Sequence, residues 1–99
     1  MKRSYYFASV NQFLADSDDA ILGALTASHP HELEHRQRNA WIDQIQLFRQ
    51  LLQAAPGFQG HLFFEFSIPR MGKRADVVLL YRGIVFVLEF TVGEQHYTK

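Results

Sequence analysis

The chain has 99 residues, which is enough for one domain with a hydrophobic core and too few for two. Hydrophobic residues make up 47% of it, as in globular and not in disordered proteins, and the formal charge of zero means that any nucleic-acid-binding surface must be local. The absence of cysteine excludes thiol catalysis and cysteine-rich zinc sites and favours a cytoplasmic protein, and no apolar run approaches the roughly 20 residues that span a membrane.

The first half of the chain is predicted to be helical. Residues 1–30 should form a lead-in of short helices, with Ser9 and Asp16 as N-caps. Residues 31–55 carry apolar side chains at helical spacing, which predicts one long helix that the following Pro56-Gly57 pair ends. The apolar stripe of this helix consists of Leu33, Trp41, Ile45, Phe48 and Leu52.

The second half is predicted to form strands. Between residues 60 and 92, three runs rich in Phe, Val, Leu and Ile are separated by turn residues, which predicts a three-stranded meander over 61–68, 75–81 and 84–92. The run from Phe63 to Phe66 indicates a strand that is buried on both faces. We therefore expect residues 1–99 to form one α+β domain, with the long helix packed on a three-stranded, mainly antiparallel sheet.

Two carboxylates of the last hairpin are predicted to face each other. A two-residue turn at Arg82-Gly83 pairs the strands so that Asp76 lies directly opposite Glu89, with both side chains on one face. A three-residue loop would instead place Leu88 opposite Asp76. Paired carboxylates among apolar neighbours share a proton, pair with a base or hold a cation, and such hard oxygen ligands suit Mg²⁺ or Mn²⁺.

The same hairpin carries a family resemblance. The run Ile-Pro-Arg-Met-Gly-Lys-Arg-Ala-Asp ending at Asp76, followed by Val-Phe-Val-Leu-Glu-Phe-Thr ending at Thr91, resembles the signature of the PD-(D/E)XK, or restriction-endonuclease-like, nuclease superfamily. It is similar in particular to nuclease-like domains that precede helicase domains in bacterial proteins. The resemblance implies that Asp76 and Glu89 bind the metal and that the Phe90 carbonyl completes its shell. It implies a nucleic-acid substrate, for which DNA is favoured and RNA stays open. An acidic residue from the first core helix often joins them, and Glu34 is the candidate.

Two departures from the family pattern predict impaired hydrolysis. Thr91 stands where the family has its catalytic lysine, and threonine neither carries a positive charge nor acts as a base at neutral pH. Arg74 lies across the hairpin from Thr91 in the favoured register and could stabilise phosphate charge, although it is a poor base. The family core continues with another helix and strand, so the resemblance covers about residues 31–99, and we expect an incomplete domain whose apolar third strand drives homo-oligomer formation.

Other interpretations of the same residues remain open. Asp76 and Glu89 could be ordinary strand-end charges bridged by Arg74 or Arg82. Lys73 and Arg74 adjoin the expected metal site and are the candidates for nucleic-acid binding.

The run His-Glu-Leu-Glu-His over residues 31–35 matches the zinc motif H-E-x-x-H, but it follows Pro30 and would open a helix, so a solvated first turn is the alternative. Two functions from different classes are therefore expected: a Mg²⁺-dependent nuclease with impaired activity, or a non-catalytic, nuclease-derived module that binds DNA, a protein partner or itself.

Overall fold

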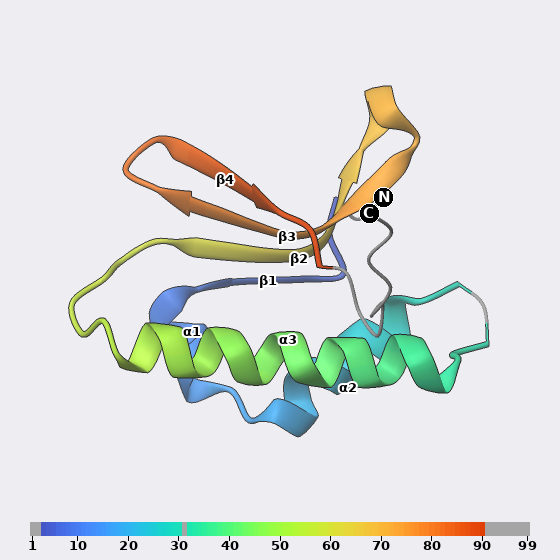
Figure 1. Cartoon of the computed structure of the whole chain (residues 1–99), viewed down its shortest axis with the longest axis horizontal. Coiled ribbons are helices and arrows are strands. Elements are labelled where there is room, and N and C mark those ends of the chain that lie inside the picture. Colours follow the sequence, from blue (N-terminus) through green and yellow to red (C-terminus); the bar gives the residue numbers. More distant parts are fainter. Residues whose placement is uncertain (1–2, 31, 91–99) are drawn as a thin grey trace, which may run out of the picture.

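The computed structural model describes residues 3–30 and 32–90, and it has an α+β fold in which one antiparallel sheet lies over the helices (Figure 1). The elements in chain order are β1 (Tyr6–Ser9), α1 (Val10–Ala15), α2 (Asp18–Ser28), α3 (His35–Gln53), β2 (His61–Ile68), a 3₁₀ turn (Pro69–Met71), β3 (Lys73–Tyr81) and β4 (Ile84–Leu88). The strand order is β1-β2-β3-β4. The predicted fold class is confirmed, but this sheet has four strands and not three.

The additional strand is β1, which lies within the segment predicted to be only helical. Tyr6 of β1 is opposite Phe64 of β2, and Ser9 is opposite His61. The prediction was wrong here because the strand has only four residues and runs directly into a helix, so it is too short to show the alternation that identifies a strand. Its stability comes from pairing with a segment more than 50 residues away, which local sequence does not reveal.

The helix caps near the N-terminus agree with prediction at one position and differ at another. The Ser9 side chain accepts a hydrogen bond from the Gln12 N–H at 3.1 Å and caps α1, as predicted. Asp16 is not an N-cap: it follows the end of α1, and Ser17 caps α2. The Asp16 carboxylate instead accepts a hydrogen bond from the Tyr6 hydroxyl at 2.7 Å, which lowers the pKa of Asp16.

The long helix α3 provides most of the helical part of the core. It begins at His35, with Glu34 as an N-cap in extended conformation, so it is shorter than the predicted 31–55. Trp41 and Ile45 are fully buried against the sheet, where they pack with Phe64 of β2 and Val77 of β3. One polar residue, Gln44, lies on this buried stripe.

Arg49 links α3 by hydrogen bonds to the connection between α1 and α2. Its Nε donates to Asp18 Oδ1 at 2.8 Å, and its two terminal nitrogens donate to the carbonyl oxygens of Leu14, at 3.2 Å, and Asp16, at 2.7 Å. The guanidinium also lies 5.2 Å from the centre of the Phe13 ring. Arg49 therefore has a structural role.

The turn between β3 and β4 is the predicted two-residue turn. Arg82 and Gly83 both have positive φ, 52° and 79°, as a type I′ hairpin turn requires. The ladder runs from Tyr81 opposite Ile84 to Val77 opposite Leu88, which confirms the favoured register and excludes the shifted one. Asp76 and Glu89 are the next positions in this register, although β4 itself ends at Leu88.

At Glu65 the regular alternation of β2 side chains between the two faces of the sheet is interrupted. This residue has a φ of 57°, which is unusual for a side chain other than glycine in a strand. The β2–β3 pairing resumes in the same register on both sides of it, with Phe64 opposite Val77 and Phe66 opposite Ala75. Phe63 and Phe66 lie on one face with ring centres 5.3 Å apart, although residues three apart in a regular strand point to opposite faces.

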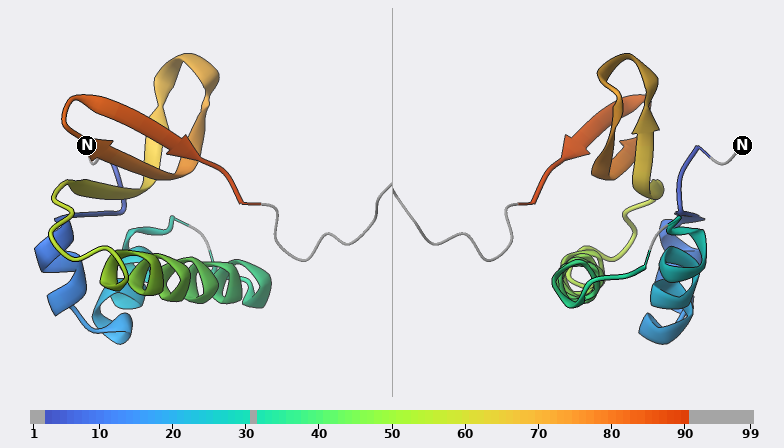
Figure 2. Two further views of the ribbon diagram at one scale, coloured as in Figure 1. Left: turned by 60° about the vertical axis from the view of Figure 1, so that its left-hand side comes forward. Right: turned by 90° about the vertical axis from the view of Figure 1, so that its right-hand side faces the viewer.

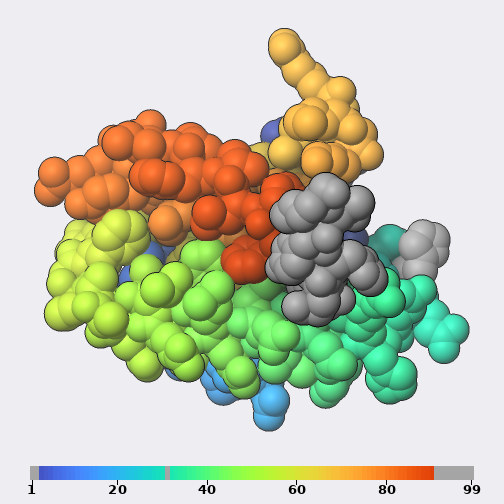
Figure 3. Space-filling model, in the orientation of Figure 1, coloured from blue at the N-terminus to red at the C-terminus, as the bar shows by residue number. Residues whose placement is uncertain are grey.

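The helices cover one face of the sheet, and no described element covers the other (Figures 1 and 2). The uncovered face has an apolar hollow lined by Phe63, Phe66, Ile68, Val78, Leu80, Val85 and Val87. In Figure 3 the β3–β4 hairpin, in orange, lies on the surface above α3, and the β4 side chains from Ile84 to Val87 are 45–58% exposed. The prediction that the Phe63–Phe66 strand is buried on both faces is therefore wrong for this outer face.

Candidate functional site

Asp76 is positioned by the end of the β3–β4 ladder. One position beyond the last pair, its Oδ2 accepts a hydrogen bond from the Phe90 N–H at 2.7 Å. The Phe90 ring packs on Phe48 of α3, with ring centres 5.9 Å apart, and this contact holds the chain after β4 against the helix. The other oxygen, Asp76 Oδ1, makes no hydrogen bond to any residue that the structure describes.

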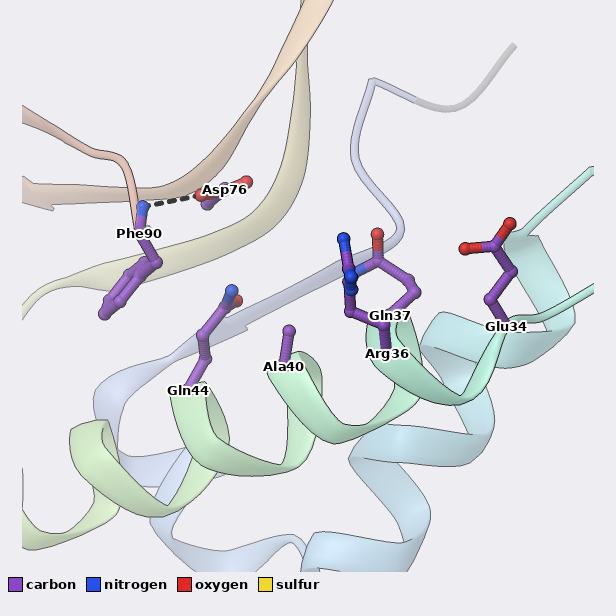
Figure 4. A pocket seen from close by; sticks show the side chains of 7 residues that line it. All are labelled: Glu34, Arg36, Gln37, Ala40, Gln44, Asp76 and Phe90. Carbon is purple, nitrogen blue, oxygen red and sulfur yellow. Dashed lines mark hydrogen bonds between the residues drawn. The ribbon is translucent and has the colours of Figure 1, made fainter. Parts of the chain in front are cut away.

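Asp76 faces a polar cavity between the sheet and the N-terminal half of α3 (Figure 4). The cavity has a volume of about 210 Å³. Its lining consists of Glu34, Arg36, Gln37, Ala40, Gln44, Asp76 and Phe90. The carboxylate predicted to bind a metal therefore shares a cavity with the predicted helix residue Glu34 and with a cation, Arg36.

Gln44 is a residue of this site that sequence analysis did not identify. It is only 3% exposed, and its Oε1 has no hydrogen-bond partner among the described residues. The sequence contained a signal for it, because Gln44 falls on the stripe defined by Trp41, Ile45 and Phe48, where an apolar residue is expected. A polar residue at such a position indicates either a hydrogen-bonded network or a binding site.

Glu65 is a second acidic residue that was assigned to the core and lies beside the site. Its Oε2 accepts a hydrogen bond from Trp41 Nε1 at 3.2 Å, so its side chain is turned toward α3. Burial raises the pKa of Glu65, the negative charges of Asp76 and Glu89 raise it further, and the Trp41 hydrogen bond and the Arg74 charge act in the opposite direction. No sequence signal predicted this orientation, because it depends on the positive φ of Glu65.

The other predicted ligands are less closely associated. Glu89 is exposed and does not line the cavity, and Thr91 lies outside the described residues. Glu34 lines the cavity from the start of α3, at the opposite end from Asp76 in Figure 4. Within residues 3–30 and 32–90, three or more His, Cys, Asp or Glu side chains are nowhere grouped closely enough to hold a metal ion.

The two predicted nucleic-acid-binding residues differ in their surroundings. Lys73 is exposed at the start of β3. Arg74 is half-buried: its Nη1 donates to the carbonyl oxygen of Glu65 at 2.8 Å, and its guanidinium lies 4.5 Å from the centre of the Tyr5 ring. Arg74 therefore supports the bend at Glu65, whereas Lys73 is available to a ligand.

The H-E-x-x-H pattern does not lie on one helix. Glu32 to Glu34 precede α3, and only His35 is helical; His31 lies outside the described residues. The expectation that this pattern opens a helix was wrong, because the N-cap of α3 is Glu34 and the helix begins only at His35. Glu32 to Glu34 therefore do not form the helical turn on which the zinc interpretation depends.

In the part of the chain that the structure describes, no helix is both long enough and apolar enough to cross a membrane. Among known proteins, no family model matches the chain, and neither does any curated protein or solved structure.

Proposed function

We propose that this chain is a nuclease-like domain of the PD-(D/E)XK type with a divalent-cation site at Asp76 and with impaired hydrolysis. The observation that carries the proposal is the placement of Asp76, which has one oxygen without a hydrogen bond to the described residues and lines the same cavity as Gln44, whose buried amide oxygen has no partner. Both are hard oxygen donors, which fits Mg²⁺ or Mn²⁺ and not a softer metal.

The residues that the resemblance assigns to the cation are Asp76, Glu89 and the Phe90 carbonyl; Asp76 and Phe90 line the cavity, whereas Glu89 is exposed beside it at the end of β4. A bound Mg²⁺ would lower the pKa of a coordinated water and offset negative charge on a phosphodiester. Asp76 is held in place for this by the Phe90 N–H, which leaves its second oxygen free. Glu34 remains a candidate only for a contact to the cation through a coordinated water, because it borders the end of the cavity opposite Asp76.

The proposed site lacks a positively charged side chain that can also transfer a proton. Thr91 cannot replace the lysine of the family pattern. Arg36 lines the same cavity and could orient a phosphate, but a guanidinium does not release its proton at neutral pH. We therefore expect the chain to bind the cation and nucleic acid but to have lost most of its hydrolytic activity.

A restored lysine tests this proposal. Thr91→Lys, incubated with DNA and separately with RNA in Mg²⁺ or Mn²⁺, should cleave one of them, and Asp76→Asn in the same background should abolish the cleavage. The unsubstituted chain should show at most a trace of cleavage. If Thr91→Lys leaves both nucleic acids intact with either ion, the chain is not a disabled nuclease.

A second candidate function is self-association as a non-catalytic module, and the observation that favours it is the exposed edge of the sheet. β4 has no partner on its outer side within the described chain, and its four exposed residues are all apolar. Exposed, apolar edge strands pair readily with a second copy. We propose a homodimer formed through β4 and the uncovered sheet face.

Light scattering with a matched pair of variants tests the dimer. Val87 on β4 and Leu51 on α3 are equally exposed, at 53%, so each can be replaced by lysine at similar cost to the monomer. Val87→Lys should convert a dimer to an 11.5 kDa monomer and Leu51→Lys should not. An unsubstituted chain that is monomeric throughout the micromolar range would contradict this function.

A further inference from the structure

Gln44 is an exception on the buried stripe of α3. Its neighbours there, Trp41, Ile45 and Phe48, are apolar in their packing and are almost fully buried. Gln44 is buried to the same degree, at 3% exposed, yet its carbonyl oxygen Oε1 has no hydrogen-bond partner among the described residues. An unsatisfied buried acceptor destabilises a protein, so such a group in a native structure needs an explanation, such as a bound water, an ion or a functional role.

The position of the Gln44 side chain indicates which ligand. It points from α3 toward the sheet, beside the Phe90 ring and on the same side as Asp76 (Figure 4). Gln44 and Asp76 both line the polar cavity, and Asp76 Oδ1 is likewise free of hydrogen bonds to the described residues. The terminal torsion of glutamine is soft, so the amide oxygen can turn into the cavity without moving the helix.

We propose that Gln44 is the helix-side ligand of the divalent cation, binding it through the amide oxygen either directly or through one coordinated water. This inference rests on the proposed function and adds a residue to it. An amide oxygen is an ordinary ligand for hydrated Mg²⁺ and Mn²⁺. Glu34, the helix residue expected from sequence, is ten positions earlier and therefore about 15 Å away along the helix axis.

Binding of Mn²⁺ measured by electron paramagnetic resonance tests the assignment without requiring activity. Gln44→Leu should weaken binding on the order of tenfold, equivalent to the loss of about 1.4 kcal/mol. Gln44→Glu should strengthen it to a similar extent, because it adds a charge at the same position. Gln46→Leu is the matched control on an exposed position of the same helix and should leave the affinity unchanged.

A second measurement separates a ligand from a residue that only fills space. Without metal, Gln44→Leu should melt at a higher temperature than the unsubstituted chain, because the unsatisfied oxygen is removed. Higher stability together with weaker Mn²⁺ binding would support the proposal, since loss of packing would reduce both. Gln44→Glu covers the case in which the leucine variant fails to fold.

The outcomes also distinguish this inference from the proposed function. If Asp76→Asn abolishes Mn²⁺ binding while both Gln44 variants bind as the unsubstituted chain does, the cation site stands and Gln44 is not part of it. If the unsubstituted chain binds no Mn²⁺ at millimolar concentration, the cation site and the role of Gln44 are both overturned.

Discussion

Replacing Arg74 shows whether this residue stabilises the fold or binds nucleic acid. Its Nη1 donates to the Glu65 carbonyl oxygen at 2.8 Å and to the Arg3 carbonyl oxygen at 3.4 Å, and the guanidinium lies 4.5 Å from the Tyr5 ring centre. The shorter hydrogen bond should contribute about 1.5 kcal/mol and the ring contact about 0.5 kcal/mol. We expect Arg74→Met to lower the free energy of unfolding by about 2 kcal/mol, or the melting temperature by about 10 °C.

Urea denaturation and thermal melts followed by circular dichroism measure these losses, with Lys73→Met as the control. Lys73 is exposed and adjacent to Arg74, so its replacement should change stability by less than about 0.5 kcal/mol. It should instead weaken binding to a short DNA duplex and reduce the slope of log affinity against log salt by about 1. An Arg74→Met variant as stable as the unsubstituted chain would refute the structural role of Arg74. Unchanged DNA binding by Lys73→Met would refute the role of Lys73 in binding nucleic acid.

Three further changes test the fold around the site. Arg49→Met removes three hydrogen bonds and should cost about 2–3 kcal/mol by urea denaturation; a loss below 1 kcal/mol would contradict this. Gly83→Ala should cost about 1–2 kcal/mol because φ is +79° there, while the control Gly23→Ala, in the open on α2, should gain about 0.5–1 kcal/mol; equal effects would refute the turn assignment. Because the folded-state pKa of Glu65 is raised, the folded protein binds the proton more tightly, so stability falls as pH rises through that pKa. Glu65→Gln should therefore raise the melting temperature at pH 7 and lose this advantage well below pH 4, whereas the exposed control Glu32→Gln should not; a gain that is independent of pH would refute the shift.

The parts of the fold that sequence predicts well are those set by local signals. The bounds of β2 were predicted as observed, because the apolar run is flanked by Gly60 and Pro69. The Arg82-Gly83 turn fixed the register of β3 and β4, since a two-residue hairpin turn of this type leaves one pairing. The position of Asp76 one step beyond the ladder follows directly from that register.

The parts that sequence did not predict depend on contacts between distant segments. β1 is held by its pairing with β2, and its own four residues contain no strand pattern. Gln44 was detectable as a polar residue on an apolar stripe, but the stripe alone does not say what lies opposite. The orientation of Glu65 was not detectable, because nothing in a Phe-Phe-Glu-Phe run indicates a positive φ.

The positive φ of Glu65 explains how one sheet presents both a polar site and an apolar surface. In a regular strand Glu65 would point the same way as Phe63, toward the uncovered apolar face, and Phe66 would point toward the helices. The change at Glu65 turns its carboxylate toward Trp41 and places Phe66 beside Phe63 instead. A left-handed conformation in a residue other than glycine costs roughly 1–2 kcal/mol, and the hydrogen bonds from Trp41 and Arg74 help to offset this cost. Glu65 thus leaves the outer face and Phe66 joins Phe63 there, so the apolar dimer surface that we propose depends on this one residue.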